Sequence, residues 1–503
     1  MASISPELPT VGYSRRSLLD LGDLVLHAVI EATLEDVPLN HAQALVGVSS
    51  HRLRQPFVLA TICQPLRQFM MSRGVFWSKI CISDTPNFDL IEASVSRSRS
   101  APLHLDIIQM NPVPLAQRDP YALRRLGAIV HHMGSRLVTL TMGFSGMDIF
   151  QFLETEHGSR CVISGGIPNL RLTAVQFATT IQPIYFVGPR TTHLDIYAHT
   201  IKPLGLVDLL KMCDGLKTLR LSYLSFDVSD EKIEVALETA ERAASGKRDT
   251  HSLHHLHIDT PSDLESTLKI ILSFFPLTIK TASSILIGPG PGPGVPPRVI
   301  DYAIIESHLD LTNMQCHNSR DVSLTVSTIS YELKSADGRL RRQFILKLMP
   351  VKYHIASPGR ATALGPLQRV VSLNLQLNQP RSILQWLDLW RKETFSELRS
   401  LVVHVVVDLT DDRPTNSIFE SVEPKAQMVA APRLEKVNFE WEVTGMVDGR
   451  AYSETDPMVH AFARLCRVVL GAFISTMAIT VDARSTRELT LPPSLIKKAI
   501  LSC

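Results

Sequence analysis

The sequence has no segment long and apolar enough to cross a membrane. The longest membrane-like stretch is residues 468–481, closed by Arg467 and Asp482, and a spanning helix needs about 20 apolar residues. The first 16 residues contain no apolar core of a secretory signal. We therefore interpret residues 468–481 as buried core, expect no membrane contact, and expect the protein in the cytoplasm or nucleus.

Paired cysteines and an excess of charge are also missing. The seven cysteines are odd in number and form no C-x-x-C pair, which disfavours a disulfide framework or a zinc ribbon and favours a reducing compartment. Lys and Arg total 51 against 49 acidic residues, a net charge of +2. The short basic stretches at 15–16 and 96–100 are typical of solvated surface, so we expect no nucleic-acid partner.

The sequence also lacks the common catalytic and cofactor motifs. Prolines interleave with the glycines of residues 288–297, so this segment cannot open a phosphate-binding helix. A histidine cluster at 251–257 is the one candidate metal site, and we interpret it as the polar face of a strand. We predict no catalytic residue, no cofactor and no metal site. An enzyme with an unrecognised site in residues 110–503 stays an alternative, and it would need a pocket that gathers titratable groups.

Helical periodicity dominates the first eighty residues. Residues 17–35 place apolar side chains at i, i+3, i+4, i+7 and i+8, which predicts one apolar helical stripe. A second helix is predicted over 41–50 and a third over 57–72. Pro65 predicts a break near Gln64, because proline is unfavourable in a helix interior. The run at 79–83 is strand-like.

After residue 100 the sequence repeats short strands of the form L-x-x-L-x-L. Helices are predicted between them, most clearly at 229–246 and 380–395. Strand-plus-helix units of this kind favour an irregular leucine-rich-repeat-like α/β solenoid. The spacing of the units varies from about 22 to more than 30 residues, wider than the regular repeat, so a plain α/β domain is the competing fold. The predicted strands are 135–142, 167–177, 191–198, 215–226, 251–259, 306–313, 367–377, 397–409 and 432–441.

Residues 21–107 resemble the N-terminal pattern of fungal F-box-like proteins. The resemblance rests on a helix signature, an aromatic turn, and a following step rich in serine and leucine. The sequence departs from the family where Gly22 replaces proline and Leu66 replaces an aromatic residue. The matching residues are Ile62, Cys63, Leu66 and Arg67 in the helix, Phe76, Trp77 and Ser78 in the turn, and Arg97, Ser98, Ser100, Pro102, Leu103 and Leu105 in the last step.

This resemblance implies a domain layout. We expect a disordered N-terminus at 1–16, an F-box-like helical module at 17–82, and a repeat body at 83–287 and 298–503. The Gly/Pro segment 288–297 would be a loop or linker between the two halves of that body.

The resemblance also implies a role as a protein-binding adaptor. Such a module docks on the linker subunit of a cullin-RING ubiquitin ligase of the SCF type, and the repeat body presents an unidentified target protein. The alternative is a repeat scaffold with no ligase attachment, since Gly22 loosens the start of the first helix. The predicted contacts to the linker subunit are Leu21, Leu24, Val25, Leu59, Cys63, Leu66 and Trp77.

Overall fold

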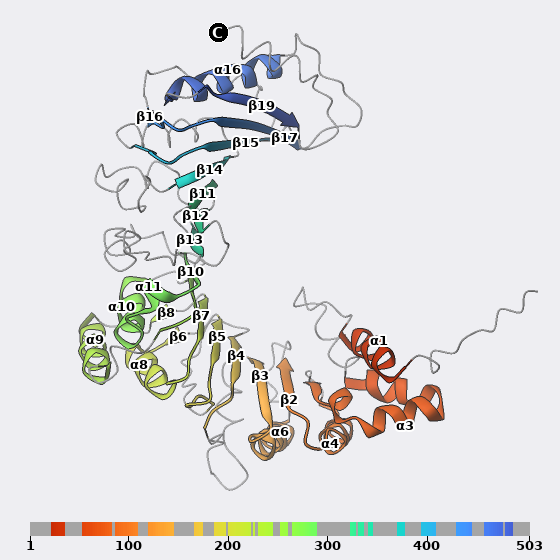
Figure 1. Ribbon diagram of the computed structural model, residues 1–503. Coiled ribbons are helices and arrows are strands. Elements are labelled where there is room, and N and C mark those ends of the chain that lie inside the picture. The colour runs from red at the N-terminus through yellow and green to blue at the C-terminus, as the bar shows by residue number, and fades with distance from the viewer. Residues whose placement is uncertain are drawn as a thin grey trace, which may run out of the picture. The chain divides into compact units, whose positions relative to one another are not determined.

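The computed structural model of the 503-residue chain has an α/β fold (Figure 1). The chain divides into two compact units, an N-terminal unit made of Met1–Phe177 with Tyr185–Gly188, and a C-terminal unit, which holds the remainder. The structure describes residues 22–35, 53–82, 86–108, 119–144, 165–174, 186–197, 200–222, 225–226, 230–244, 252–259, 264–288, 322–327, 330–335, 341–345, 370–377, 394–408, 429–444, 457–475 and 478–485.

The N-terminal unit begins with a helical module: α1 (Asp23–Glu35), helical residues 53–62, α3 (Gln64–Ser72) and the 3-10 turn η2 (Gly74–Trp77). The predicted break in the third helix is confirmed. Cys63 is extended, with φ −155° and ψ 161°, and a proline occupies the first turn of α3. A proline is tolerated there because the first helical N–H groups have no partner within the helix.

A parallel sheet follows the helical module. Its order is β1 (Lys79–Ile82), β2 (Leu103–Ile108), β3 (Leu137–Phe144) and β4 (Asn169–Ala174). Consecutive strands are therefore neighbours, and the strands predicted at 79–83, 135–142 and 167–177 are confirmed. One face of the sheet is buried along two registered rows: Ile80, Leu105, Leu140 and Leu170, then Ile82, Ile107, Met142 and Leu172.

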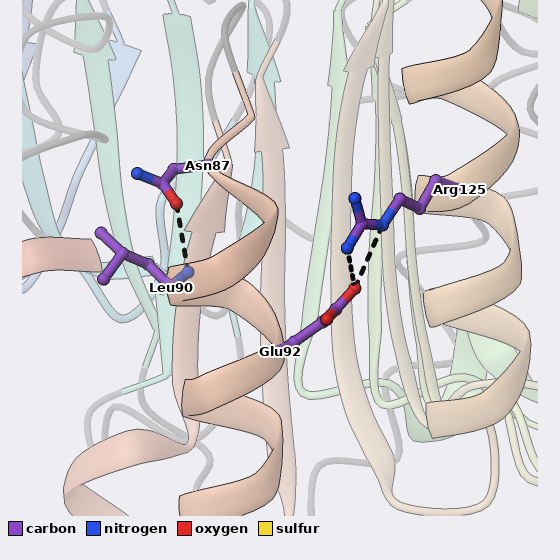
Figure 2. Close-up of polar contacts among 4 residues, drawn as sticks. All are labelled: Asn87, Leu90, Glu92 and Arg125. Atoms are coloured by element: carbon purple, nitrogen blue, oxygen red, sulfur yellow. Dashed lines mark hydrogen bonds and ion pairs between the residues drawn. The ribbon is translucent and has the colours of Figure 1, made fainter.

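Two helices accompany this sheet, α4 (Phe88–Arg97) and α6 (Pro120–Met133). Figure 2 shows the polar contacts that fix them. The side chain of Asn87 caps α4 by accepting a hydrogen bond from the Leu90 N–H at 3.1 Å. Arg125 on α6 donates to Glu92 on α4 from Nε at 3.1 Å and from Nη2 at 2.5 Å. This hydrogen bond raises the pKa of Arg125.

The C-terminal unit opens with a second run of parallel strands. Successive main strands are again neighbours, and they alternate with helices that pack on one another, α9 on both α8 and α10. The predicted helix 229–246 is confirmed as α9. The elements are β5 (His193–Tyr197), β6 (Thr200–Ile201), α8 (Pro203–Met212), β7 (Thr218–Ser222), β8 (Ser225–Phe226), α9 (Asp230–Ala244), β9 (His255–Asp259), α10 (Leu264–Phe274), α11 (Thr278–Thr281) and β10 (Ser284–Gly288).

The sheet then continues through a reversed three-stranded meander. Its spatial order from β10 is β13 (Arg341–Ile345), β12 (Ser330–Ser335) and β11 (Val322–Ser327). Strand β13 is parallel to β10, β12 is antiparallel to both neighbours, and β11 is parallel to the next strand, β14. The last elements are β14 (Val370–Leu377), β15 (Ser400–Asp408), β16 (Val429–Ala430), β17 (Lys436–Thr444), α16 (Pro457–Ala472), β18 (Phe473–Ile474) and β19 (Thr480–Ser485).

Several segments that the sequence analysis assigned lie wholly or partly outside the residues that the structure describes. The helix predicted at 41–50, the strand at 306–313, most of the helix at 380–395 and the Gly/Pro segment beyond Gly288 lie outside them. The apolar stretch 468–481 is divided among α16, β18 and β19. In the part of the chain that the structure describes, no helix is long and apolar enough to cross a membrane.

Burial alternates along β5, β7, β9 and β10, except that the last two residues of β7, β9 and β10 are both buried. The Leu219 side chain is fully buried between Leu194 and Leu256 in register, whereas Thr218 lies on the opposite face. The predicted polar face of the histidine cluster is confirmed in part: His254 and His255 are exposed and His257 is half-buried, while Leu253, Leu256 and Ile258 are buried. His251 lies outside the described residues. Helix and sheet side chains therefore share one core on one side of this sheet.

Replacing Leu219 with alanine should lower the stability of the C-terminal unit by about 2–5 kcal/mol, because a fully buried leucine leaves a cavity. Thr218→Ala, one residue earlier on the other face, should change it by less than about 0.5 kcal/mol. The measurement is the midpoint of urea unfolding followed by circular dichroism. Equal shifts for the two variants would contradict the assignment of the faces.

Candidate partner-binding surface

The helical module is built around its own apolar core. The Trp77 side chain is 1% exposed, and its Nε1 donates to the Met70 carbonyl oxygen at 3.0 Å. A buried indole N–H needs such a partner, so this hydrogen bond fixes η2 against the end of α3. The buried core residues are Leu26, Ile30, Ala60, Leu66, Met70, Phe76 and Trp77.

A stacked arginine joins this core to α4. The Arg97 guanidinium lies 4.7 Å from the ring centroids of both Phe57 and Trp77. The two rings meet edge to face, with centroids 5.0 Å apart. The arginine covers the apolar rings while its charge interacts with their π faces.

The segment after α4 forms a close backbone junction with the helical module. A Cβ atom on Gly74 would lie 2.3 Å from the Ser98 carbonyl oxygen, so only glycine fits at this position. Ser98 is fully buried, and its Oγ accepts from Arg136 Nη2 at 2.6 Å. Arg99 has a positive φ of 52° and donates from Nη2 to the Met71 carbonyl oxygen at 3.2 Å. The end of α3 is thus held by the residues that follow α4.

Helix α1 is apolar on its outer side as well as on its core side. Leu26 and Ile30 are buried in the module core. Aliphatic side chains on the opposite side of the helix are exposed, by 85% at Leu24 and 49% at Val25. A polar strip of Asp23, His27 and Glu31 lies between these two apolar sides of the helix. The exposed aliphatic residues of the outer side are Leu24, Val25, Ala28, Val29 and Ala32, and we call them the α1 outer face.

The structure places the predicted linker contacts in three groups. Leu24 and Val25 lie on the α1 outer face, and Leu59 and Cys63 are half-buried beside the core. Leu66 and Trp77 are core residues, and Leu21 lies outside the described residues. Val29, Val58 and Ile62 are also exposed, although they were not predicted as contacts. The sequence could have indicated them, because Val25 and Val29, like Val58 and Ile62, are four residues apart and therefore lie on the same side of a helix.

A cavity of about 250 Å³ lies between the helical module and the first strands. His104 lies in its wall and contacts Thr139, with Nδ1 and Oγ1 3.0 Å apart. Burial lowers the pKa of His104, Lys79 lowers it further, and Asp106 opposes both. The lining is Glu31, Leu34, Pro56, Val75, Phe76, Lys79, Ile80, Cys81, His104, Asp106 and Thr139. Apolar and polar side chains of both the module and the sheet thus line one small cavity.

No protein-family model matches the chain, and no curated protein matches it.

Replacing Arg97 with glutamine should lower stability by about 1–2 kcal/mol, because two cation–π contacts are lost. Arg124→Gln, an exposed arginine on α6, is the matched control and should leave stability unchanged. Thermal unfolding of the full chain followed by tryptophan fluorescence measures the difference. The stacking assignment fails if both variants melt at the wild-type temperature.

The lowered pKa of His104 predicts an acid-sensitive N-terminal unit. The His104 ring binds fewer protons in the folded unit than in the unfolded chain. The free energy of unfolding is therefore highest at neutral pH and falls as the pH drops below the ordinary histidine pKa of about 6.5. His104→Gln should reduce the loss of thermal stability between about pH 7.5 and pH 5.5. His132→Gln, exposed on α6, is the control. A loss of the same size in all three proteins would refute this role.

Proposed function

We propose that this chain is an F-box-like adaptor of an SCF-type ubiquitin ligase. Its helical module binds the linker subunit of the ligase, and its strand-rich body binds a target protein. The role is one of binding and not of catalysis, and it is exercised in the cytoplasm or nucleus. The observation that carries the proposal is the α1 outer face, an aliphatic helical surface that the described part of the chain leaves exposed.

The α1 outer face has the character of a docking surface for another protein's helices. Val25 and Val29 lie one turn apart, and Leu24 flanks them. Each Å² of apolar surface removed from water contributes about 25 cal/mol, so covering this face favours association. Asp23 at the start of the helix is paired with Arg73 at 2.8 Å, which gives the apolar face a charged rim.

The core beneath this face supports docking because it fixes α1 before a partner arrives. Leu26 and Ile30 enter the same cluster as Phe76 and Trp77. Gln55 also donates to the Thr33 carbonyl oxygen at 2.7 Å, which joins the helical residues 53–62 to the end of α1. Ordering costs at the interface are therefore small. In this proposal Leu66 and Trp77 act by holding the module together, and the exposed residues make the contact.

The strand order supports a solenoid-like body. In each unit, consecutive main strands are parallel neighbours, as in β2–β3–β4 and in β5–β7–β9–β10. Strand-plus-helix units that stack in this way bury one face of the sheet and leave the other for recognition. We therefore propose an irregular leucine-rich-repeat-like solenoid whose polar sheet face meets the target.

The double variant Val25→Asp/Val29→Asp should weaken binding of the purified linker subunit at least about tenfold, because two charges would enter an apolar interface. Its melting temperature should stay near that of the wild type, since both side chains are exposed. Val235→Asp on α9, an equally exposed valine at 51%, is the control. Calorimetric titration of the full chain measures the affinity.

A wild-type chain that does not bind the linker subunit would reject ligase attachment and leave the alternative, a repeat scaffold for protein interactions. Linker binding that survives the α1 substitutions would instead show that the proposed face is wrong.

A further inference from the structure

A row of polar side chains crosses the sheet of the C-terminal unit at the start of its strands. In register across β5, β7, β9 and β10, the row reads His193, Thr218, His255 and Ser284. Both histidines are exposed, and one strand separates them. Neighbouring strands lie about 4.8 Å apart, so the two histidine positions are about 9.6 Å apart.

Hydroxyl groups hold both imidazole rings through Nδ1. Thr192 Oγ1 lies 2.9 Å from Nδ1 of His193, and Ser283 Oγ lies 3.3 Å from Nδ1 of His255. Ser283 donates its only hydrogen to the His254 carbonyl oxygen at 2.9 Å, so it must accept from the Nδ1–H of His255. The Nδ1 atom of His255 is thus occupied within the protein, and Nε2 is the ring nitrogen that can meet a ligand.

The backbone of Lys217 lies between the segments that carry the two histidines, and its exposed side chain adds a positive charge at this end of the sheet. Its backbone N–H donates to the Thr192 carbonyl oxygen at 2.8 Å, and its carbonyl accepts from the His254 N–H at 2.7 Å. Burial lowers the pKa of His193, and the nearby His255 and Lys217 lower it further. An anion placed among these groups would relieve this repulsion. The other titratable or charged groups on this face or at this end of the neighbouring strands include Arg190, Asp195, Asp214, Arg220, His254, His257 and Arg341, and Arg341 is ion-paired with Glu332.

We propose that Lys217, His193 and His255 bind the carboxylates of an acidic segment of the target protein. This inference rests on the proposed function in that it names the chemistry of the target, although the binding itself requires no ligase. An extended chain in the polyproline II conformation repeats every three residues and rises about 3.1 Å per residue. Glutamates three residues apart would therefore match the separation of about 9.6 Å between the two histidines.

The probe is a fluorescein-labelled peptide of three Glu-Pro-Pro repeats, titrated with the full chain and followed by fluorescence anisotropy. Affinity should be higher at about pH 6 than at about pH 8, because protonated imidazoles bind the anion and glutamate stays ionised at both values. A peptide of three Gln-Pro-Pro repeats should bind at least about tenfold more weakly at pH 6.

The variant His193→Gln/His255→Gln should weaken binding of the glutamate peptide at least about tenfold at pH 6 and abolish its pH dependence. The control is His131→Gln/His132→Gln, two exposed histidines on α6, which should bind like the wild type. Lys217→Gln should weaken binding at both pH values, whereas Lys211→Gln on α8, also exposed, should not.

Equal binding of the Glu and Gln peptides, or equal binding by the double variant and the wild type, overturns the proposal. A peptide with phosphoserine in place of glutamate that binds more than about tenfold tighter also overturns it, because the row would then be a phosphopeptide site. The Val25→Asp/Val29→Asp variant should bind the glutamate peptide normally. A wild-type chain that binds the glutamate peptide but not the linker subunit therefore rejects ligase attachment alone, and one that binds the linker subunit but not the peptide rejects the acidic-segment site alone.

Discussion

The period-two alternation of a β-strand is the constraint on which the structure depends. Each strand must bury its leucines and isoleucines on one side, so the residues between them are forced onto the other. In the C-terminal unit this places Leu194, Leu219 and Leu256 in one buried row. The same geometry necessarily aligns His193, Thr218 and His255 on the opposite face. The same alternation therefore serves both packing and recognition. Burying the leucines in register also brings the polar residues between them into register on the exposed face.

The helical module is held together by long-range contacts and not by strand alternation. Its core is closed by aromatic and charged groups that are far apart in the sequence, with Arg97 stacked on Phe57 and Trp77. The backbone contact between Gly74 and Ser98 brings α3 and the end of α4 together. These contacts make the module and the first strands of the N-terminal unit mechanically continuous. A partner on the α1 outer face would therefore be attached to the sheet through rigid contacts and not through a free linker.

Much of the strand pattern could be predicted from the sequence, because L-x-L alternation is a local signal. The break before α3 was also predictable from Pro65. The meander β11–β12–β13 was not, since its residues lack the leucine pattern and its spatial order is reversed relative to the chain. Helical periodicity identified the apolar residues of the module but could not say which face would be covered. Both residues are leucines, yet Leu24 is exposed and Leu66 lies in the core. The Ser283 hydroxyl that contacts the His255 ring comes from a distant segment, so it gave no sequence signal, whereas Thr192 directly precedes His193.

The meander has a consequence for how this sheet can change in length. Its outer strands, β13 and β11, run in the same direction as β10 and β14, to which they are hydrogen-bonded. Only the middle strand, β12, is reversed. Removing all three strands would leave two parallel edges whose donors and acceptors could pair directly. The three strands of the meander could therefore be inserted or deleted in evolution without reversing the direction of any other strand. The sheet could thus lengthen by insertion at this point as well as by adding strands at its ends.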